Sequence, residues 1–525
     1  MSVVPDELPE GWCISTIEEL CELNPKHDSS LKANLPVSFV PMAAVSEVEG
    51  QITTAEVRPL GEVKKGYTHF ADGDVILAKI TPCMENGKAA SVRRMVNGLA
   101  CGTTEFFVFR PRGAIYQDYL FKFIRQESFR RAARATMQSG VGQARVPKEF
   151  VLEAEIPLAP LPEQHRIVAK IEALQARSRK AREALEAIPS LLEQFRQSVL
   201  AAAFRGDLTA DWREQHPDVE PASVLLERIR TERRRKWEQA ELAKLKAKGK
   251  KPKDDSWKEK YVELEPVENT DVPELPDGWC WASLGEIVSG LQQGWSPKCE
   301  NDATDNPTSW AVIKTTAVQA MAFLPHENKK LPKSLEPVVE LEIQKHDLLI
   351  TRAGPRVRAG VMCLVKEVRK RLILCDKAYR FRAENGVVPE YLEITLNSPQ
   401  CVSALDALKT GISDSGVNLT QDRFLELQVP LPPSTEQLAI AERARRYWND
   451  SVSIQNNASE LANELNTLDQ SILAKAFRGE LVPQDPNDEP ASALLERIRS
   501  QLSEEESVTI GTAIPRRRAN SGRKI

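Results

Sequence analysis

Residues 156–164 read IPLAPLPEQ and residues 429–437 read VPLPPSTEQ, so that one stretch occurs twice in the chain. The same separation in residue number holds between SVLAAAFRGDL at residues 198–208 and SILAKAFRGEL at residues 471–481. Two matches that keep one register over this distance indicate an internal duplication, which has to be recognised before single motifs are interpreted. We therefore expect two equivalent halves.

The duplication extends toward both ends of each half. LPEGW at residues 8–12 returns as LPDGW at 275–279, and PASVLLERIR at 221–230 returns as PASALLERIR at 490–499. The separation of the last pair is slightly shorter than that of the FRG segments, which requires only a four-residue difference in the preceding loop. Nearly the whole chain is thus covered by the repeat.

The interiors of the two halves, residues 39–145 and 310–418, share a pattern but few identities. In both, short apolar runs alternate with turn residues, as in GDVILAKITP at residues 73–82 and HDLLITRAGP at residues 346–355. Short apolar runs bounded by Gly and Pro are typical of strands. We predict an α+β fold with two mixed α/β domains.

A long helical pattern follows the Glu-Gln pair of each half and runs to the glycine of FRG, a typical residue at a helix C-terminus. Apolar residues recur there at alternating steps of four and three, the spacing of a coiled-coil seam. The seam positions are Ile167, Ile171, Leu174, Ser178, Ala181, Leu185, Ile188, Leu192, Phe195 and Val199, and in the second half Ile440, Ala444, Tyr447, Ser451, Ile454, Ala458, Leu461, Leu465, Leu468 and Ile472. We expect residues 163–204 and 436–477 to form two helices that pack side by side.

The composition is typical of a globular chain. Hydrophobic residues make up 41% and charged residues 28% of the 525 residues, a length that suggests two to four domains of about 150 residues each. The sequence has no apolar run of about 18 residues and no signal-peptide pattern at its start, so we expect a cytoplasmic location and no membrane contact. The nine cysteines form no CxxC pair, so a metal site is not expected.

The formal net charge is −4, so any nucleic-acid surface has to be local or completed by a partner, because Lys and Arg neutralise phosphates. Residues 228–260 carry 14 Lys or Arg against 6 Asp or Glu, and their first part has a helical pattern. The role of this segment stays open between a solvated linker and a contact with DNA or an acidic partner. After residue 503 we expect a disordered basic tail.

Arg, Lys, Asn and Gln side chains reach base edges and phosphates, and small hydroxyl residues also bond there. Several stand in glycine-containing segments of the two interiors, where the backbone can approach a ligand closely. The candidate DNA-binding residues of the first half are Lys79, Thr81, Asn86, Lys88, Gln138, Gln143 and Arg145. Those of the second half are Arg352, Arg356, Arg358, Ser413, Ser415 and Asn418. For each single residue, a solvated loop position is the alternative.

Signatures of catalysis are missing from the sequence. There is no Asn-Pro-Pro-aromatic tetrapeptide of the kind that amino-methyltransferases use to hold a base, and no G-x-G-x-x-G after a strand. Gly61 and Gly66 have P-loop spacing, but Tyr67 replaces the phosphate-binding lysine. Glu62 and Lys64 match half of a nuclease motif without an Asp-bearing strand upstream. We expect a chain that is not an enzyme and binds no cofactor.

Taken together, these features resemble the specificity subunits of type I restriction-modification systems over almost the full length. The most specific elements are PLPEQHRIVAKIEAL at residues 160–174, the FRGDL and FRGEL boxes, the PAS-x-LLERIR segments and the LP-x-GW openings. One departure is that Ser434 and Thr435 replace the Leu-Pro of the first half. The resemblance implies two target-recognition domains held apart by two antiparallel coiled-coil helices with pseudo-two-fold symmetry.

The resemblance also implies a division of the chain into named parts. These are target-recognition domain 1 at 1–158, helix 1 at 159–206, a helical basic linker at 207–272, target-recognition domain 2 at 273–431, helix 2 at 432–479, and a C-terminal helix and tail at 480–525. Subunit contacts are expected at the helix starts, where a helix-capping role is the alternative. The residues concerned are Glu163, Gln164, Glu436 and Gln437.

The function implied is sequence-specific binding of double-stranded DNA. Because the two domains differ in sequence, each is expected to read a different half of an asymmetric, bipartite site. The expected partners are two methyltransferase subunits for adenine methylation and motor-nuclease subunits for ATP-dependent restriction. S-adenosylmethionine, ATP and Mg are expected in those partners and not in this chain. The alternatives are a DNA-free coiled-coil scaffold and a catalytic methyltransferase or nuclease.

Overall fold

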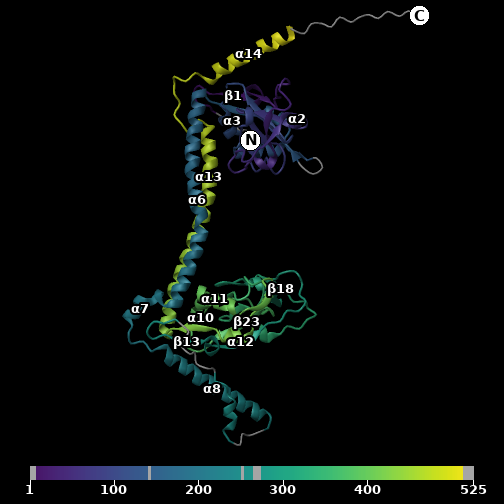
Figure 1. Ribbon diagram of the computed structural model, residues 1–525. Helices are drawn as coiled ribbons and strands as arrows, with labels where there is room; N and C mark the ends of the chain where they lie inside the picture. Colours follow the sequence, from purple (N-terminus) through teal and green to yellow (C-terminus); the bar gives the residue numbers. More distant parts are fainter. Residues whose placement is uncertain (1–6, 140–143, 250–253, 264–272, 512–525) are drawn as a thin grey trace, which may run out of the picture. The chain divides into compact units, whose positions relative to one another are not determined.

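The structure is a computed structural model that describes residues 7–139, 144–249, 254–263 and 273–511. It divides into two compact units, which are unit 1, with Met1–Glu186 and Ser459–Ile525, and unit 2, with Ala187–Ala458 (Figure 1). Each unit contains one mixed domain and a part of both long helices. Gln143 and the basic end of the chain after residue 511 lie outside the described residues.

Unit 1 consists of a mixed domain followed by helices. The domain comprises β1 (Cys13–Thr16), α1 (Ile17–Leu20), β2 (Cys21–Leu23), β3 (Pro36–Val40), β4 (Glu56–Pro59), α2 (Leu60–Val63), β5 (Thr68–Ala71), β6 (Val75–Ala78), β7 (Ala89–Ser91), β8 (Leu99–Gly102), β9 (Phe106–Pro111), α3 (Gln117–Ile124), α4 (Glu127–Thr136), β10 (Gln138–Ser139), β11 (Ala144–Arg145), α5 (Lys148–Leu152) and β12 (Glu155–Leu158). The long helices are α6 (Leu161–Arg205) and α13 (Ser434–Ala476), and α14 (Ala491–Gly511) follows.

Two four-stranded sheets form the centre of the first domain, in the orders β2-β9-β6-β7 and β4-β3-β8-β5. The strands β1 and β12 pair with each other at the start and end of the domain. The core between domain and helices contains Tyr119 and Phe123 of α3 together with Ile171 of α6 and Leu473 of α13. The Phe477 ring lies 4.8 Å from the Tyr119 ring, so the long helices are part of this core.

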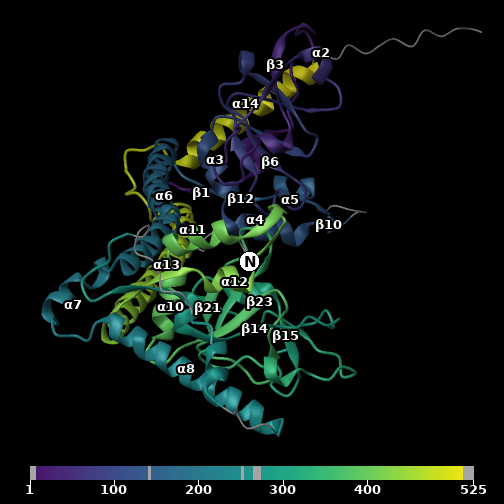
Figure 2. The same cartoon turned by 60° about the horizontal axis from the view of Figure 1, so that its bottom comes forward.

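Unit 2 repeats this plan. Its elements after α6 are α7 (Ala210–Gln215), α8 (Ala222–Ala247), β13 (Cys280–Ser283), α9 (Leu284–Ile287), β14 (Val288–Gln293), β15 (Ala311–Ile313), β16 (Val318–Gln319), β17 (Ala322–Phe323), β18 (Asn328–Lys330), β19 (Leu348–Thr351), β20 (Ala353–Gly354), β21 (Met362–Leu364), β22 (Leu372–Ile373), β23 (Ala378–Ala383), α10 (Pro389–Leu396), α11 (Pro399–Leu408), β24 (Thr410–Ser413), β25 (Gly416–Asn418), α12 (Gln421–Leu425) and β26 (Gln428–Leu431). The main sheet has the order β14-β23-β19-β21, and α10 contacts its strands β21 and β23 (Figure 2).

The predicted duplication is confirmed by element positions. Adding 273 to the bounds of β6 gives those of β19, and adding 273 to those of β12 gives those of β26. Adding 272 takes α3 onto α10 and α4 onto α11. The predicted fold class of two mixed domains with long helices is therefore confirmed.

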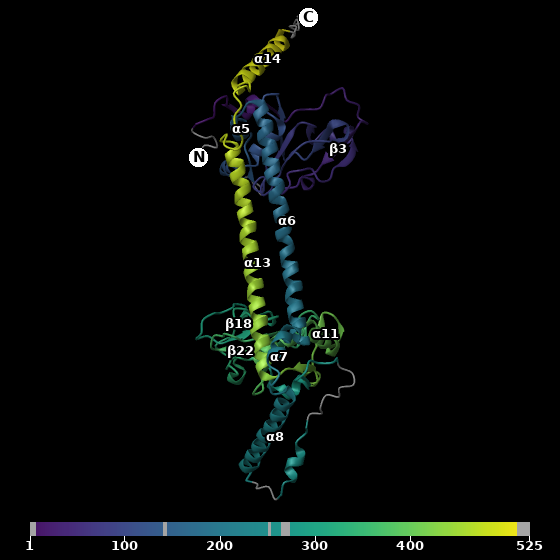
Figure 3. The ribbon, with the colours of Figure 1, turned by 90° about the vertical axis from the view of Figure 1, so that its left-hand side faces the viewer.

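The two long helices run antiparallel within each unit (Figure 3). In unit 1, Arg182 of α6 donates to Asp469 of α13 at 2.7 Å. In unit 2, Arg196 of α6 donates to the Ser451 hydroxyl at 2.8 Å. Both helices end near the predicted glycines, and Gly206 has a φ of +81°, the left-handed conformation that favours glycine after a helix.

The apolar spacing predicts two buried rows of residues between these helices, but the structure buries mainly one row. Ser178, Leu192, Ser451 and Ala458 are buried, each pair separated by one or two heptads. The alternate row is largely exposed, with Phe195, Tyr447, Ile454, Leu461 and Leu468 each 40–50% accessible. A pair of helices covers only the row that faces the partner helix, so the second apolar row stays at the surface.

The repeated PAS-x-LLERIR segments form helix starts that dock on the two domains in the same way. In unit 2, Leu225 and Ile229 of α8 are buried, and Arg230 pairs with Glu286 at 2.7 Å. In unit 1, α14 buries Leu495 and Ile498, and Arg499 pairs with Glu19 at 2.6 Å. Within the described ranges, no helix has the length and apolar character needed to span a membrane.

Candidate nucleic-acid interface

The two candidate segments of the first domain meet in space. The loop after β6, residues 79–88, lies against the hairpin of β10 and β11. Thr81 donates its backbone N–H to the Ala144 carbonyl at 3.1 Å, and the Thr81 hydroxyl accepts the Ala144 N–H at 3.3 Å. The Lys79 carbonyl accepts the Val146 N–H at 2.9 Å. The loop and the hairpin therefore form one surface, which we call reader surface 1.

Several side chains of reader surface 1 form hydrogen bonds with neighbouring residues of the chain. Asn86 is exposed and donates to Glu47 at 3.2 Å, and Lys88 donates to the Met42 carbonyl at 3.3 Å. Arg145 makes two hydrogen bonds to Glu105, at 3.1 and 2.9 Å, and these lower the pKa of that carboxyl. The Gln138 side chain and Gln143 lie outside the part of the chain that the structure describes.

The candidate segments of the second domain meet in the same manner. The loop that follows β19 contributes β20, which pairs with β25, with Ala353 opposite Asn418. The Arg352 carbonyl accepts the Leu419 N–H, and the Arg356 N–H donates to the Asp414 carbonyl, both at 2.8 Å. We call this loop and the β24–β25 hairpin reader surface 2.

The three arginines of reader surface 2 differ in the groups that their side chains bind. Arg356 pairs with Asp406 at 2.5 Å and with Asp414 at 3.1 Å, and Arg352 donates to the Asp376 carbonyl at 2.9 Å. Arg358 donates to the Gln319 side chain and to the carbonyls of residues 315 and 318, so it holds the loop in place. Ser413, Ser415 and Asn418 are exposed, and the two serine hydroxyls lie 2.9 Å apart.

The Glu-Gln pairs at the helix starts, which were predicted to contact other subunits, are buried within the chain. Glu163 and Glu436 are each 1% exposed, and Gln164 and Gln437 are fully buried. Trp12 donates its indole N–H to Glu163 at 3.1 Å, and Trp279 donates to Glu436 at 2.8 Å. Their burial supports the alternative role at the helix starts: these side chains anchor each domain to its long helix and face the interior of the chain, and the subunit contact stays a prediction.

The glutamines complete this anchor. Gln164 accepts the Tyr116 N–H at 2.7 Å and donates to the Ala159 carbonyl at 2.8 Å. Gln437 accepts the Val388 N–H at 2.8 Å and donates to the Pro432 carbonyl at 2.9 Å. Burial raises the pKa of Glu163 because the charged form loses hydration there.

We expect Glu436→Gln to lower the stability of the chain alone by about 1–3 kcal/mol, because a buried acceptor oxygen is lost. In the native protein Oε1 accepts from Thr209 and Arg213, and Oε2 accepts from Trp279. Denaturant unfolding would measure the effect, with Glu442→Gln at an exposed position of α13 as the control. Unchanged stability together with weaker subunit assembly would contradict the anchoring role.

No group of three or more His, Cys, Asp or Glu side chains with metal-binding geometry occurs among the described residues. The nine cysteines are free, and burial raises the pKa of Cys21 to about 12 and that of Cys280 to about 11. Such thiols stay protonated at neutral pH.

Known proteins share both sequence and fold with this chain. The family model described as type I restriction modification DNA specificity domain matches residues 9–188. The type I restriction enzyme EcoEI specificity subunit of Escherichia coli is 34% identical, over 85% of this chain and 79% of that protein. The EcoAI specificity subunit of Escherichia coli is 30% identical, over 82% of this chain and 77% of that protein.

Two solved structures have the same fold. The HsdS subunit from Thermoanaerobacter tengcongensis covers 91% of this chain and 100% of its own length with a TM-score of 0.57, at 22% identity. A chain solved for the complex assembly and conformational transition of the type I R-M system reaches a TM-score of 0.61 at 21% identity, with the same coverage.

Proposed function

Because this chain belongs to the specificity subunits of type I restriction-modification systems, we propose that reader surfaces 1 and 2 each contact the bases of one half of a bipartite DNA site. The chain supplies DNA specificity and is not the catalytic component of such a system. One observation carries the proposal: a loop and a hairpin meet at equivalent positions of both domains, but with different side chains. Two different surfaces imply two different half-sites, and therefore an asymmetric target.

The partners follow from the same proposal. Two methyltransferase subunits would methylate an adenine in each half-site, flipping the base out of the duplex, and motor-nuclease subunits would carry out restriction. S-adenosylmethionine would be bound by the methyltransferases, and ATP with Mg by the motor-nuclease subunits. The exposed apolar row of α6 and α13, which includes Phe195 and Tyr447, supports a protein contact along the helices.

The proposal is tested at Asn418, which is exposed on β25. Amide side chains bind adenine edges, and one such contact discriminates between bases by about 1–3 kcal/mol. We expect Asn418→Ala to relax the specificity at a position of one half-site and to leave the other half-site unchanged. Mapping of methylated adenines in cells that express the variant with its methyltransferase would measure this.

Asn385→Ala is the matched control, since Asn385 is also exposed in the second domain but lies outside reader surface 2. An Asn418→Ala variant that methylates an unchanged motif with unchanged affinity would place base reading elsewhere in the domain.

A further inference from the structure

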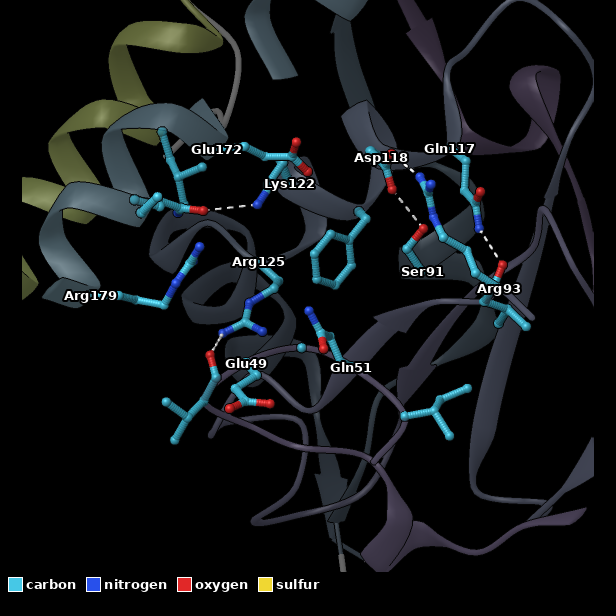
Figure 4. Close-up of a pocket in the computed structure, with 18 of the residues that line it drawn as sticks. Glu49, Gln51, Ser91, Arg93, Gln117, Asp118, Lys122, Arg125, Glu172 and Arg179 are labelled. Carbon is cyan, nitrogen blue, oxygen red and sulfur yellow. Dashed lines mark hydrogen bonds and ion pairs between the residues drawn. The ribbon is translucent and has the colours of Figure 1, made fainter. Parts of the chain in front are cut away.

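A groove of about 1570 Å³ lies between the first domain and the helices of unit 1 (Figure 4). Its walls come from residues 48–55 and 91–95, from α3 and the residues after it, and from α6 and α13. Cationic side chains outnumber carboxylates in these walls. The cations are Arg93, Arg94, Lys122, Arg125, Arg130, Arg179 and Arg182, and the carboxylates are Glu49, Asp72, Asp118, Glu172 and Asp469.

Two of these cations are neutralised within the protein. Arg93 pairs with Asp118, and Arg182 pairs with Asp469 at 2.7 Å. The others differ: among the described residues, none makes an ion pair with Lys122, Arg125 or Arg179. Arg125 donates to the carbonyls of residues 47 and 48 at 3.0 Å, and Lys122 donates to the Gln175 amide at 2.9 Å.

The environment of Lys122 and Arg125 is unfavourable for positive charge. Burial lowers the pKa of Lys122, and burial together with the neighbouring Arg130 lowers the pKa of Arg125. Glu172 near Lys122 offsets part of the cost of these partly buried cations, and an anion that enters the site would lower the cost further. The walls of the groove thus fit an anionic ligand.

The common framework of the two domains does not require these charges. When α3 is aligned with α10 over the full length of both helices, Lys122 corresponds to Ile394 and Arg125 to Asn397. When α6 is aligned with α13 in the register of the repeated FRG segments, Arg179 corresponds to Val452. The second domain folds in the same way without a positive charge at any of these positions, so their presence in unit 1 points to binding.

The groove is continuous with reader surface 1. Asn86, a residue of the reader loop, lines it, and Arg130 of the groove donates to the Glu85 carbonyl of the same loop at 2.8 Å. A duplex that is read at this loop carries about one negative charge per 1.7 Å of its axis, so its backbone matches the charge of the groove. This continuity favours DNA over an acidic protein segment as the occupant.

We propose that the groove binds phosphates of the DNA next to the half-site of the first domain, and that α6 contributes Arg179 to this contact. The inference rests on the proposed DNA-reading function. It adds that a long helix touches the duplex outside the bases that are read. Such contacts fix the position of the protein on the duplex and carry no sequence information.

Arg179→Gln tests the proposal, with Arg177→Gln as the matched control. Both arginines are exposed on α6, but two residues turn the helix by about 200°, and Arg177 does not line the groove. The variants are compared as complexes with the methyltransferase, on a duplex that contains the methylated motif. Losing one phosphate contact should weaken binding about eightfold at about 0.1 M salt and make the salt slope of log K shallower by about 0.9.

Glu172→Gln provides a test with the opposite sign. Glu172 lines the groove near Lys122 and would repel a phosphate there (Figure 4). Its neutralisation should tighten binding to DNA, a result that a damaged fold does not produce. Arg177→Gln should leave the affinity and the salt slope unchanged.

Two results would overturn the proposal. One is an Arg179→Gln complex with the affinity and salt slope of the native complex. The other is weaker assembly of Arg179→Gln with the methyltransferase at unchanged DNA affinity, which would assign the groove to an acidic protein segment. Failure of the proposed reading function is distinguishable, because the native complex itself would then bind the motif no better than a scrambled duplex.

Discussion

Leu192→Asp is expected to lower the free energy of unfolding of the chain by about 3 kcal/mol or more. Leu192 is 7% exposed in α6, one turn before Arg196, whose guanidinium reaches Ser451 of α13 within unit 2. A carboxylate at this position loses hydration, and the apolar contacts of the leucine are lost. The shift of the unfolding midpoint in urea would measure the effect.

The neighbouring residue is the control. Leu191 is 59% exposed, so Leu191→Asp keeps the same helix and the same added charge but should change stability by no more than about 0.5 kcal/mol. Leu465 of α13 is only partly buried, so Leu465→Asp should fall between the two. Equal effects of Leu191→Asp and Leu192→Asp would show that the helices do not pair through this row.

The helices could be predicted closely because their signals are local. Apolar spacing, the Glu-Gln starts and the FRG glycines placed them at 163–204 and 436–477, and the structure has Leu161–Arg205 and Ser434–Ala476. Burial along the seam was less predictable. Periodicity shows which residues share a face, but the width of the covered stripe depends on how many neighbours the helix has.

The candidate site was predicted only in part, because local patterns do not show which distant residues meet. Glycine-containing segments with polar side chains pointed to loops, and the structure brings these loops and hairpins together in both domains. The burial of Glu163 and Glu436 was missed because their tryptophan partners lie 151 and 157 residues away in the sequence. The groove cations were missed because Lys122 lies in an ordinary amphipathic helix with Arg125 directly after it, and only the fold brings them opposite Arg179.

Because each reader surface is formed within one domain, the outcome of a domain exchange can be predicted. Residues 21–146 contain reader surface 1 and carry β2 together with its partner β9, so that the sheet moves as a whole. The anchor residues Trp12, Glu163 and Gln164 stay behind in the recipient chain. We expect replacement by the matching segment of another family member to change one half of the methylated sequence completely and to preserve the other half.

The reciprocal exchange of residues 288–419 is the matched control, since it moves reader surface 2 with β14 and β23 and should change only the other half. Long-read mapping of methylated adenines would give both motifs from one genome, and methylation itself reports that each chimaera folds and assembles. If one exchange altered both halves in an active complex, the bases would be read by a surface shared between the domains. Two independent changes, one for each exchange, would follow from two reader surfaces that each belong to one domain, because each surface is closed by hydrogen bonds within its own domain.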